Sequence, residues 1–240
     1  MNPSTLLNPQ QREAVETTRG PMLILAGAGS GKTRVIVHRI AHLIREQVPP
    51  SRIIAVTFTN KAANEMNERL SQMLGESGKG IHLSTFHSLG VRILRETIDL
   101  LGYHKNFVIY DSQDQLALIR NLMDEEGISE SPLIDPKSAQ QMIHHAKTRG
   151  TSPEELLVPN AQPRTRLAGQ LYLQYQETLK GCNALDFEDI LNFCLKLFES
   201  HAEKMQDIRD RFRYVMVDEY QDCLLYTSPS QRDRTRDRMP

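Results

Sequence analysis

Two short segments contain residue types that together could bind a phosphate group and act on it. The first, AGAGSGKT, places small residues ahead of Lys32 and Thr33. Small residues let backbone N–H groups close around phosphate oxygens at the start of a helix. In such a loop the lysine reaches the β- and γ-phosphates, and the threonine hydroxyl holds Mg²⁺. The spacing predicts a P-loop with alanine in place of the usual first glycine, and the alternative is a chance glycine-rich turn. The phosphate-binding residues are expected to be Ala26, Gly27, Ala28, Gly29, Ser30, Gly31, Lys32 and Thr33.

The second segment, VDEYQD, places Asp218 and Glu219 directly after the apolar run YVMV. In a P-loop protein, an acid at the carboxyl end of a strand is the expected partner of Mg²⁺. An adjacent second acid can orient and deprotonate the attacking water. The alternative is a pair of solvated acids that opens a loop. We expect Lys32 and Glu219 to be catalytic, and Thr33 and Asp218 to hold Mg²⁺.

The elements that must position these residues alternate between short apolar runs and helical patterns, which predicts an α/β fold with a parallel sheet. The run at 22–26 is continuously apolar, as in a strand that is buried on both faces. The runs at 53–58, 81–84 and 214–217 are further strand candidates, expected as neighbours in one sheet. Helical spacing relates two sets of apolar residues, Ile36, Ile40, Leu43 and Ile44, and Ala62, Met66, Leu70 and Met73.

The stretch between the third and fourth runs has mainly helical patterns. Ser112 and Gln115 fit a capping box, and Asp135 followed by Pro136 fits an N-cap with proline at the first helical position, with Gly150 as a possible stop. Two apolar stripes are expected to face the core: Leu167, Leu171, Tyr175 and Leu179, ending near Gly181, and Phe187, Ile190, Cys194 and Leu197, starting at Asp186. The prediction is an incomplete P-loop sheet domain, residues 1–87 and 213–222, interrupted by a helical subdomain at 88–212.

Composition and charge give few restrictions on function. The chain has 240 residues, 39% hydrophobic and 25% charged, and a formal net charge of -1, so a nucleic-acid partner would need a local basic face. Its three cysteines, Cys182, Cys194 and Cys223, lack ligand-like spacing and indicate a reducing compartment. His38 and His42 have a spacing that a metal could use, but no third ligand accompanies them, so we expect no zinc. Without a signal peptide or an apolar run long enough for a bilayer, we expect a cytoplasmic protein with no membrane partner.

Six segments in order resemble the superfamily 1 helicases of the UvrD/Rep group, which includes Rep, UvrD and PcrA. The segments are LNPQQREAV, AGAGSGKTRV, AVTFTNKAANEM, STFHSLG, ALDFEDIL and VMVDEYQD. The resemblance runs from about Leu7 to Asp222. It implies a RecA-like motor domain, called 1A, with the helical insertion 1B. It also implies an ATP-dependent helicase that moves 3′→5′ on single-stranded DNA and acts at DNA junctions, in DNA repair or replication.

The resemblance also implies roles for individual residues. Gln11 matches the glutamine that reads the adenine edge, and Arg34 matches a position near the base and sugar. Two motifs match segments that lie along single-stranded DNA, namely Phe58, Thr59 and Asn60, and Thr85, Phe86 and His87. Aromatic faces can stack on bases of any sequence while polar groups hold phosphates. Core packing is the alternative for the two phenylalanine rings.

The sequence departs from the family pattern after Asp222, where relatives continue with Thr-Asn and a GDxxQSIYxWRG segment. The second RecA-like domain and the arginine fingers of later motifs do not appear. An arginine finger contributes roughly 10³–10⁵ to turnover, and translocation needs two domains that close around ATP. We therefore expect the 240-residue chain alone to bind ATP, to hydrolyse it very slowly and not to unwind DNA.

The segment 223–240 changes character, with Arg232, Arg234, Arg236 and Arg238 alternating with other residues. It could be a basic nucleic-acid arm, a disordered tail, or foreign sequence joined to a truncated frame, which is the interpretation we favour. Two other functions remain open. The chain could be the motor part of a helicase–nuclease, or a nucleotide-dependent module that binds single-stranded DNA. A small-molecule kinase would not explain TFTNKAA or STFH.

Overall fold

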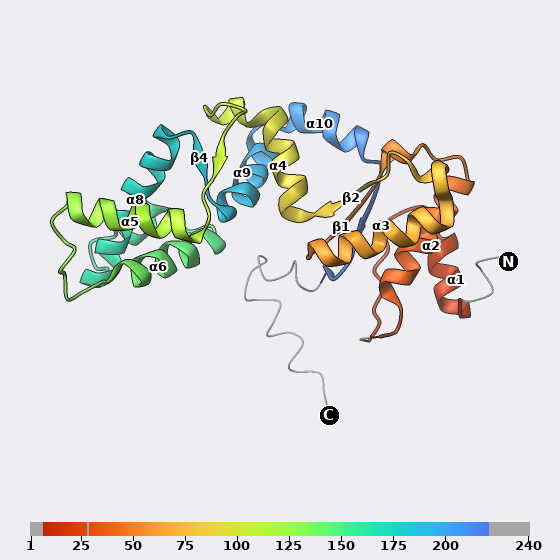
Figure 1. The fold of residues 1–240 in the computed structure, drawn as a ribbon, viewed down its shortest axis with the longest axis horizontal. Coiled ribbons are helices and arrows are strands. Elements are labelled where there is room, and N and C mark those ends of the chain that lie inside the picture. Colours follow the sequence, from red (N-terminus) through yellow and green to blue (C-terminus); the bar gives the residue numbers. More distant parts are fainter. Residues whose placement is uncertain (1–6, 28, 221–240) are drawn as a thin grey trace. The chain divides into compact units, whose positions relative to one another are not determined.

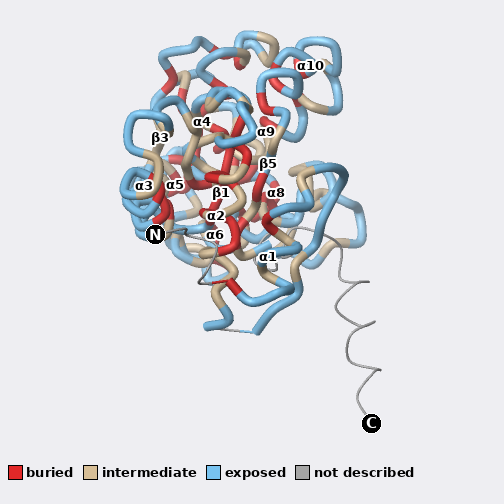
Figure 2. The backbone as a smooth tube through the Cα atoms, turned by 90° about the vertical axis from the view of Figure 1, so that its right-hand side faces the viewer, coloured by how far each residue is buried: buried red, intermediate tan, exposed pale blue. Residues whose placement is uncertain are grey.

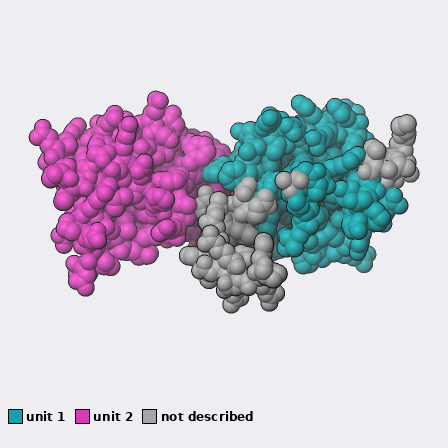
Figure 3. Space-filling model, turned by 90° about the horizontal axis from the view of Figure 1, so that it is seen from below, with its two compact units in different colours: residues 1–89, 203–240 teal, residues 90–202 magenta. Residues whose placement is uncertain are grey.

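The structure is a computed structural model, and it describes residues 7–27 and 29–220 (Figure 1). Ala28 and the segment 223–240 lie outside the described residues. The chain divides into two compact units, which Figure 3 distinguishes by colour. Unit 1 consists of residues 1–89 and 203–240, and unit 2 is the continuous stretch 90–202. None of the described helices is both long and apolar enough to cross a membrane.

Unit 1 has a small parallel sheet with helices packed on it. Its strands are β1 (Ile53–Thr57), β2 (His82–Thr85) and β5 (Tyr214–Val217), in the order β2-β1-β5. Its helical segments are α1 (Pro9–Glu16), α2 (Lys32–Arg45), η2 (Pro50–Arg52), α3 (Asn60–Leu74), η3 (Gly75–Gly78), the start of α4 (Phe86–Thr97) and most of α10 (Ala202–Arg211). This confirms the predicted α/β fold class with an incomplete RecA-like sheet.

The register of the sheet brings distant parts of the chain together. Ala55 pairs with Leu83 on β2 and with Met216 on β5. All five residues of the central strand are buried, as the red tube at β1 in Figure 2 shows. The apolar face of α2 packs on this sheet, so the helix that follows the P-loop is fixed by the core. The members of this cluster are Ile36, Val37, Ile40, Leu43, Ile53, Ala55, Met66, Leu70 and Met216.

The strand predicted at 22–26 does not form, which corrects one expectation. This segment pairs with no strand among the described residues. Leu23 and Leu25 are 65% and 86% exposed, while Ile24 packs near Val15 and Val35. An apolar run becomes a buried strand only when neighbouring strands complete its hydrogen bonds. The other three candidates are confirmed as β1, β2 and β5.

Unit 2 is mainly helical and has a short two-stranded parallel sheet of its own. Its strands are β3 (Val108–Ile109) and β4 (Ala184–Leu185). Its helical segments, besides most of α4, are η4 (Ile98–Leu101), α5 (Ser112–Glu125), α6 (Pro136–Thr148), α7 (Pro153–Leu156), α8 (Pro163–Gly181) and α9 (Phe187–Ser200). The expected caps Asp135 and Asp186 are confirmed, since each accepts backbone N–H groups of the helix that it starts.

Three details of the insertion differ from the sequence interpretation. The cap of α5 is Asp111, whose partner is Asp114, one position before the predicted Ser112 and Gln115, because a carboxylate can accept two N–H groups at once. Phe187 was expected in the core but is 49% exposed. Residues 203–212, which the sequence analysis assigned to the insertion, group with unit 1.

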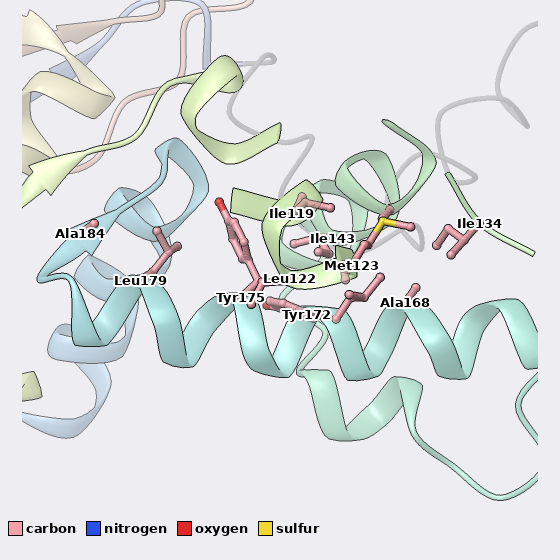
Figure 4. Close-up of a cluster of buried hydrophobic side chains, with 13 residues drawn as sticks. Ile119, Leu122, Met123, Ile134, Ile143, Ala168, Tyr172, Tyr175, Leu179 and Ala184 are labelled. Carbon is pink, nitrogen blue, oxygen red and sulfur yellow. The ribbon is translucent and has the colours of Figure 1, made fainter. Parts of the chain in front are cut away.

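The core of unit 2 lies between α5, α6 and α8. Figure 4 shows Ala168, Tyr172 and Tyr175 along α8 facing Ile119 and Ile143. The size and burial of this cluster make unit 2 a compact body in its own right.

A buried ionic group joins three elements of unit 2. Lys147 of α6 is 1% exposed and lies 2.5 Å from Asp186 and 2.8 Å from Asp189. The Tyr175 hydroxyl donates to Asp186, and the Gln176 amide donates to Asp189. Burial raises the pKa of Asp189 to about 6, although the Lys147 ammonium opposes this shift. These bonds fix the first turn of α9 against α6 and α8.

Candidate nucleotide and metal site

The P-loop connects the exposed segment 22–26 to helix α2. Gly29 and Gly31 have φ values of 75° and 87°, a backbone region that glycine enters without strain. Gly31 is the N-cap of α2, and no side chain makes a cap hydrogen bond there. N–H groups at a helix start favour anions, so the described residues 29–33 suit a phosphate group.

Lys32 lies over the loop that it follows. Its ammonium donates to the carbonyl oxygens of Ala26 at 3.1 Å and of Gly27 at 3.4 Å. Ser30 closes the loop by donating its hydroxyl to Gly27 at 2.7 Å. The ammonium thus lies at the loop itself. If a phosphate bound there, Lys32 could donate to a charged phosphate oxygen in place of a carbonyl oxygen.

Thr33 and Asp218 meet although 185 residues separate them. The Thr33 hydroxyl donates to Asp218 Oδ2 at 2.7 Å, and Asp218 is 3% exposed. The backbone N–H of Asp218 donates to Val56 at 2.9 Å, which extends the β1–β5 ladder by one residue. The geometry therefore joins the two predicted metal-binding residues at the carboxyl edge of the sheet.

These residues fit a magnesium ion by the chemistry of their donor atoms. Mg²⁺ binds hard oxygen ligands and is usually held by one or two protein oxygens together with substrate phosphates. Thr33 and Asp218 supply a hydroxyl and a carboxylate at one point, next to the loop with phosphate-binding geometry. Among the described residues, no group of three or more histidine, cysteine or acidic side chains could hold a metal ion by itself.

Glu219 follows Asp218 in an unusual backbone conformation. Its φ is 54°, a left-handed value that is rare for residues other than glycine. Its backbone N–H donates to Asp218 Oδ1 at 3.1 Å, so both oxygens of Asp218 accept hydrogen bonds. The partly buried Glu219 is thus held immediately beside the predicted metal-binding carboxylate.

Gln11 is part of the site, and both ends of its side-chain amide are engaged. Its oxygen accepts from Asn8 N at 3.0 Å within the capping box of α1, and its nitrogen donates to Ser30 O at 3.0 Å. Arg34 lies on the first turn of α2 and is partly buried. Gln11 therefore ties α1 to the P-loop, and reading an adenine would require it to exchange a partner.

The residues expected along DNA lie at the carboxyl ends of β1 and β2. Phe58, Thr59 and Asn60 are exposed, and Phe58 is 51% exposed, so the core-packing alternative does not hold for this ring. Thr59 caps α3 by accepting from Ala62 N at 3.1 Å.

In the second motif, Thr85 is 7% exposed and its hydroxyl lies 2.9 Å from the Ser88 hydroxyl. Phe86 and His87, in the first turn of α4, are partly buried.

Thr57 was not among the expected site residues, yet it ends β1 beside Asp218. It is 2% exposed, and its hydroxyl has no hydrogen-bond partner within residues 7–27 and 29–220. The signal in the sequence is a single polar residue at the end of the run IIAVT. Periodicity cannot show that its hydroxyl is unpaired, because pairing depends on the neighbouring strands.

Comparison with known proteins places this site within a family. The family model of the UvrD/REP helicase N-terminal domain matches residues 7–232, nearly the whole chain. The chain belongs to the UvrD/REP helicase family. The match continues past Asp222, the last residue of the six motifs that resemble the family.

Curated relatives of this UvrD/REP family chain include bacterial helicases. The chain is 45% identical to the ATP-dependent DNA helicase PcrA of Bacillus subtilis over 217 residues, which is 90% of this chain and 29% of that protein. It is 42% identical to the proteins of the same description from Staphylococcus epidermidis and Staphylococcus aureus, over 90% of this chain and 30% of each relative. The chain thus spans about three tenths of the length of these relatives.

Proposed function

We propose that this chain is the nucleotide-binding part of an ATP-dependent DNA helicase that moves 3′→5′ on single-stranded DNA and acts at junctions. The observation that carries this proposal is the hydrogen bond between Thr33 and Asp218, which joins the P-loop to the acidic motif at 2.7 Å. Family membership and the PcrA relatives support it.

Each polar residue of the site has a proposed task. Lys32 binds the β- and γ-phosphates, and the N–H groups of the P-loop hold the same oxygens. Thr33 and Asp218 hold Mg²⁺, which neutralises charge on the phosphates when it is bound. Glu219 accepts a proton from the attacking water. Gln11 and Arg34 contact the base and sugar once Gln11 releases one of its present partners.

The exposed residues after β1 and β2 are proposed to contact single-stranded DNA. Phe58 presents an aromatic face on which a base can stack, and Thr59 and Asn60 are exposed beside it. Thr85 is buried and bonded to Ser88, so we propose that it shapes the start of α4, from which Phe86 and His87 reach the strand.

A polypeptide limited to these 240 residues is proposed to bind Mg²⁺–ATP, to hydrolyse it very slowly and not to unwind DNA. Motor activity requires a second domain that closes on the nucleotide and supplies arginine to the transition state, a contribution of roughly 10³–10⁵ in turnover. Unwinding of a duplex with a 3′ single-stranded overhang by this polypeptide would contradict the proposal.

The test of the catalytic assignment is Glu219→Gln in a complete helicase that contains this chain. We expect ATP binding to be retained and hydrolysis to fall by at least about a hundredfold, because the amide cannot accept a proton. Steady-state hydrolysis and equilibrium binding of a fluorescent ATP analogue measure the two properties. Glu68→Gln, on an exposed position of α3, is the control and should change neither. Normal turnover of the Glu219 variant would remove the assignment.

A further inference from the structure

Thr57 holds a buried hydroxyl that the fold itself does not use. Within the described residues of unit 1, its Oγ1 is the one buried side-chain polar atom without a hydrogen-bond partner. The other such atoms belong to Thr148, Gln174 and Gln176 of unit 2. An unpaired buried hydroxyl destabilises a fold and is retained where it has another use.

The alternation of side chains along the strands shows where this hydroxyl lies. Ile53 and Ala55 belong to the cluster that packs against α2, and Thr57 points to the same face of β1 because side chains repeat every two residues. By the same rule Asp218 shares this face with Met216 on β5. The pairing of Val56 with Val217 then makes Thr57 and Asp218 adjacent across the ladder.

Thr85, Thr57 and Asp218 form a row across β2, β1 and β5, and the two neighbours of Thr57 in this row already have partners. On β2, Thr85 pairs with Thr57 in register, and its hydroxyl is bonded to Ser88. On the other side, Asp218 accepts from Thr33 and from the Glu219 backbone. Thr57 is therefore the residue of this row whose hydroxyl can donate a hydrogen bond to a ligand.

We propose that Thr57 is a positioning residue for the bound Mg²⁺–nucleotide, to which its hydroxyl donates a hydrogen bond. This inference rests on the proposed function and adds a residue that neither the P-loop nor the acidic motif contains. The ligand class is a metal–triphosphate, because its oxygens carry negative charge and would meet a donor that is buried and fixed. The Thr57 hydroxyl holds that group against Asp218 and takes no part in proton transfer.

The decisive variant is Thr57→Val, which removes the hydroxyl and keeps a side chain of similar shape. Without a ligand, its melting temperature should equal or exceed that of the wild type, because no hydrogen bond of the fold is lost. The affinity for a non-hydrolysable fluorescent ATP analogue with Mg²⁺ should fall roughly ten- to hundredfold, the loss expected for one hydrogen bond to a charged group. Both measurements use the full 240-residue chain.

Two further variants separate positioning from general effects of the substitution. Thr57→Ser keeps the hydroxyl and should restore most of the affinity. Thr148→Val removes another buried hydroxyl without a partner, in α6 of unit 2, so it should leave the affinity unchanged.

The affinity and the melting temperature of Thr57→Val together decide whether the inference holds. Loss of affinity in Thr57→Val, with an unchanged or higher melting temperature and rescue by serine, supports the inference. Wild-type affinity in Thr57→Val overturns it and leaves the proposed function intact. A lower melting temperature also overturns it, because the hydroxyl would then serve the fold. If the wild-type chain fails to bind the analogue, the proposed function fails, and the inference fails with it.

Discussion

Glu219, the proposed acceptor of a proton from water, has a backbone conformation that is rare for residues other than glycine. Its left-handed φ of 54° follows directly on a buried aspartate whose two oxygens both accept hydrogen bonds. A side chain in this region costs about 1–2 kcal/mol relative to the right-handed region, a penalty that glycine avoids. The surrounding structure, including the bond from the Glu219 N–H to Asp218, must hold this conformation.

Replacing Glu219 by glycine and by alanine should separate strain from chemistry. Both variants lose the carboxylate, but only glycine relieves the left-handed backbone. We expect Glu219→Gly to be more stable than Glu219→Ala by about 1 kcal/mol in urea unfolding at equilibrium. Equal stabilities would show that the backbone at this position is not strained.

Some contacts of the candidate site can be anticipated from the sequence because residue type restricts their geometry. The glycines at 29 and 31 adopt the left-handed values that a P-loop needs, and Thr33 meets Asp218 as the motif chemistry requires. Two features could not be predicted in this way. The positive φ of Glu219 follows from its neighbours, and the unpaired hydroxyl of Thr57 depends on strands that lie far away in the sequence.

At the scale of elements, a helix start can be predicted from a few neighbouring residues, whereas a strand also depends on distant partners. Asp135 before Pro136 and Asp186 before α9 could be predicted as caps, because a cap depends only on residue types within a few positions. The run at 22–26 has the composition of a buried strand, but a strand also needs partners, and none pairs with it among the described residues. Phe187 likewise fits a helical stripe, yet it lies at the exposed end of α9.

The ionic group of Lys147 provides a test of how α6, α8 and α9 are held together. Lys147→Met should destabilise the protein by about 3–5 kcal/mol, because Asp186 and Asp189 would keep buried charge without a cation. The same substitution at Lys79, whose pair with Glu76 is largely exposed, should have little effect. Urea unfolding followed by circular dichroism compares the two, and similar losses would contradict the structural role of the buried group.

At the scale of the whole molecule, unit 2 is a continuous stretch of sequence inserted between the two segments of unit 1. The order of the motifs predicts this, since helical patterns separate the third predicted strand from the acidic motif. The boundaries are harder to predict, because α4 runs from unit 1 into unit 2 without a break and α10 has an ordinary amphipathic pattern. Neither helix contains a residue whose type indicates the boundary between the two units.

Unit 2 should fold when it is separated from the rest of the chain. It has its own core and the buried ionic group, so a polypeptide of residues 86–202, which includes all of α4, should be helical and unfold cooperatively. Circular dichroism with thermal unfolding measures this. The same polypeptide with Lys147→Met should melt at a lower temperature. A gradual loss of signal without a transition would show that unit 2 depends on unit 1.

The bond between Thr33 and Asp218 also has a consequence for biosynthesis. Ribosomes add about 5–20 residues per second, so a separation of 185 residues makes the carboxylate emerge roughly 10–40 s after the hydroxyl. Unit 2 is translated during this interval, and the sheet of unit 1 lacks β5 until the interval is almost over. A nascent chain therefore contains the P-loop well before Asp218, the acidic partner of Thr33, has been synthesised.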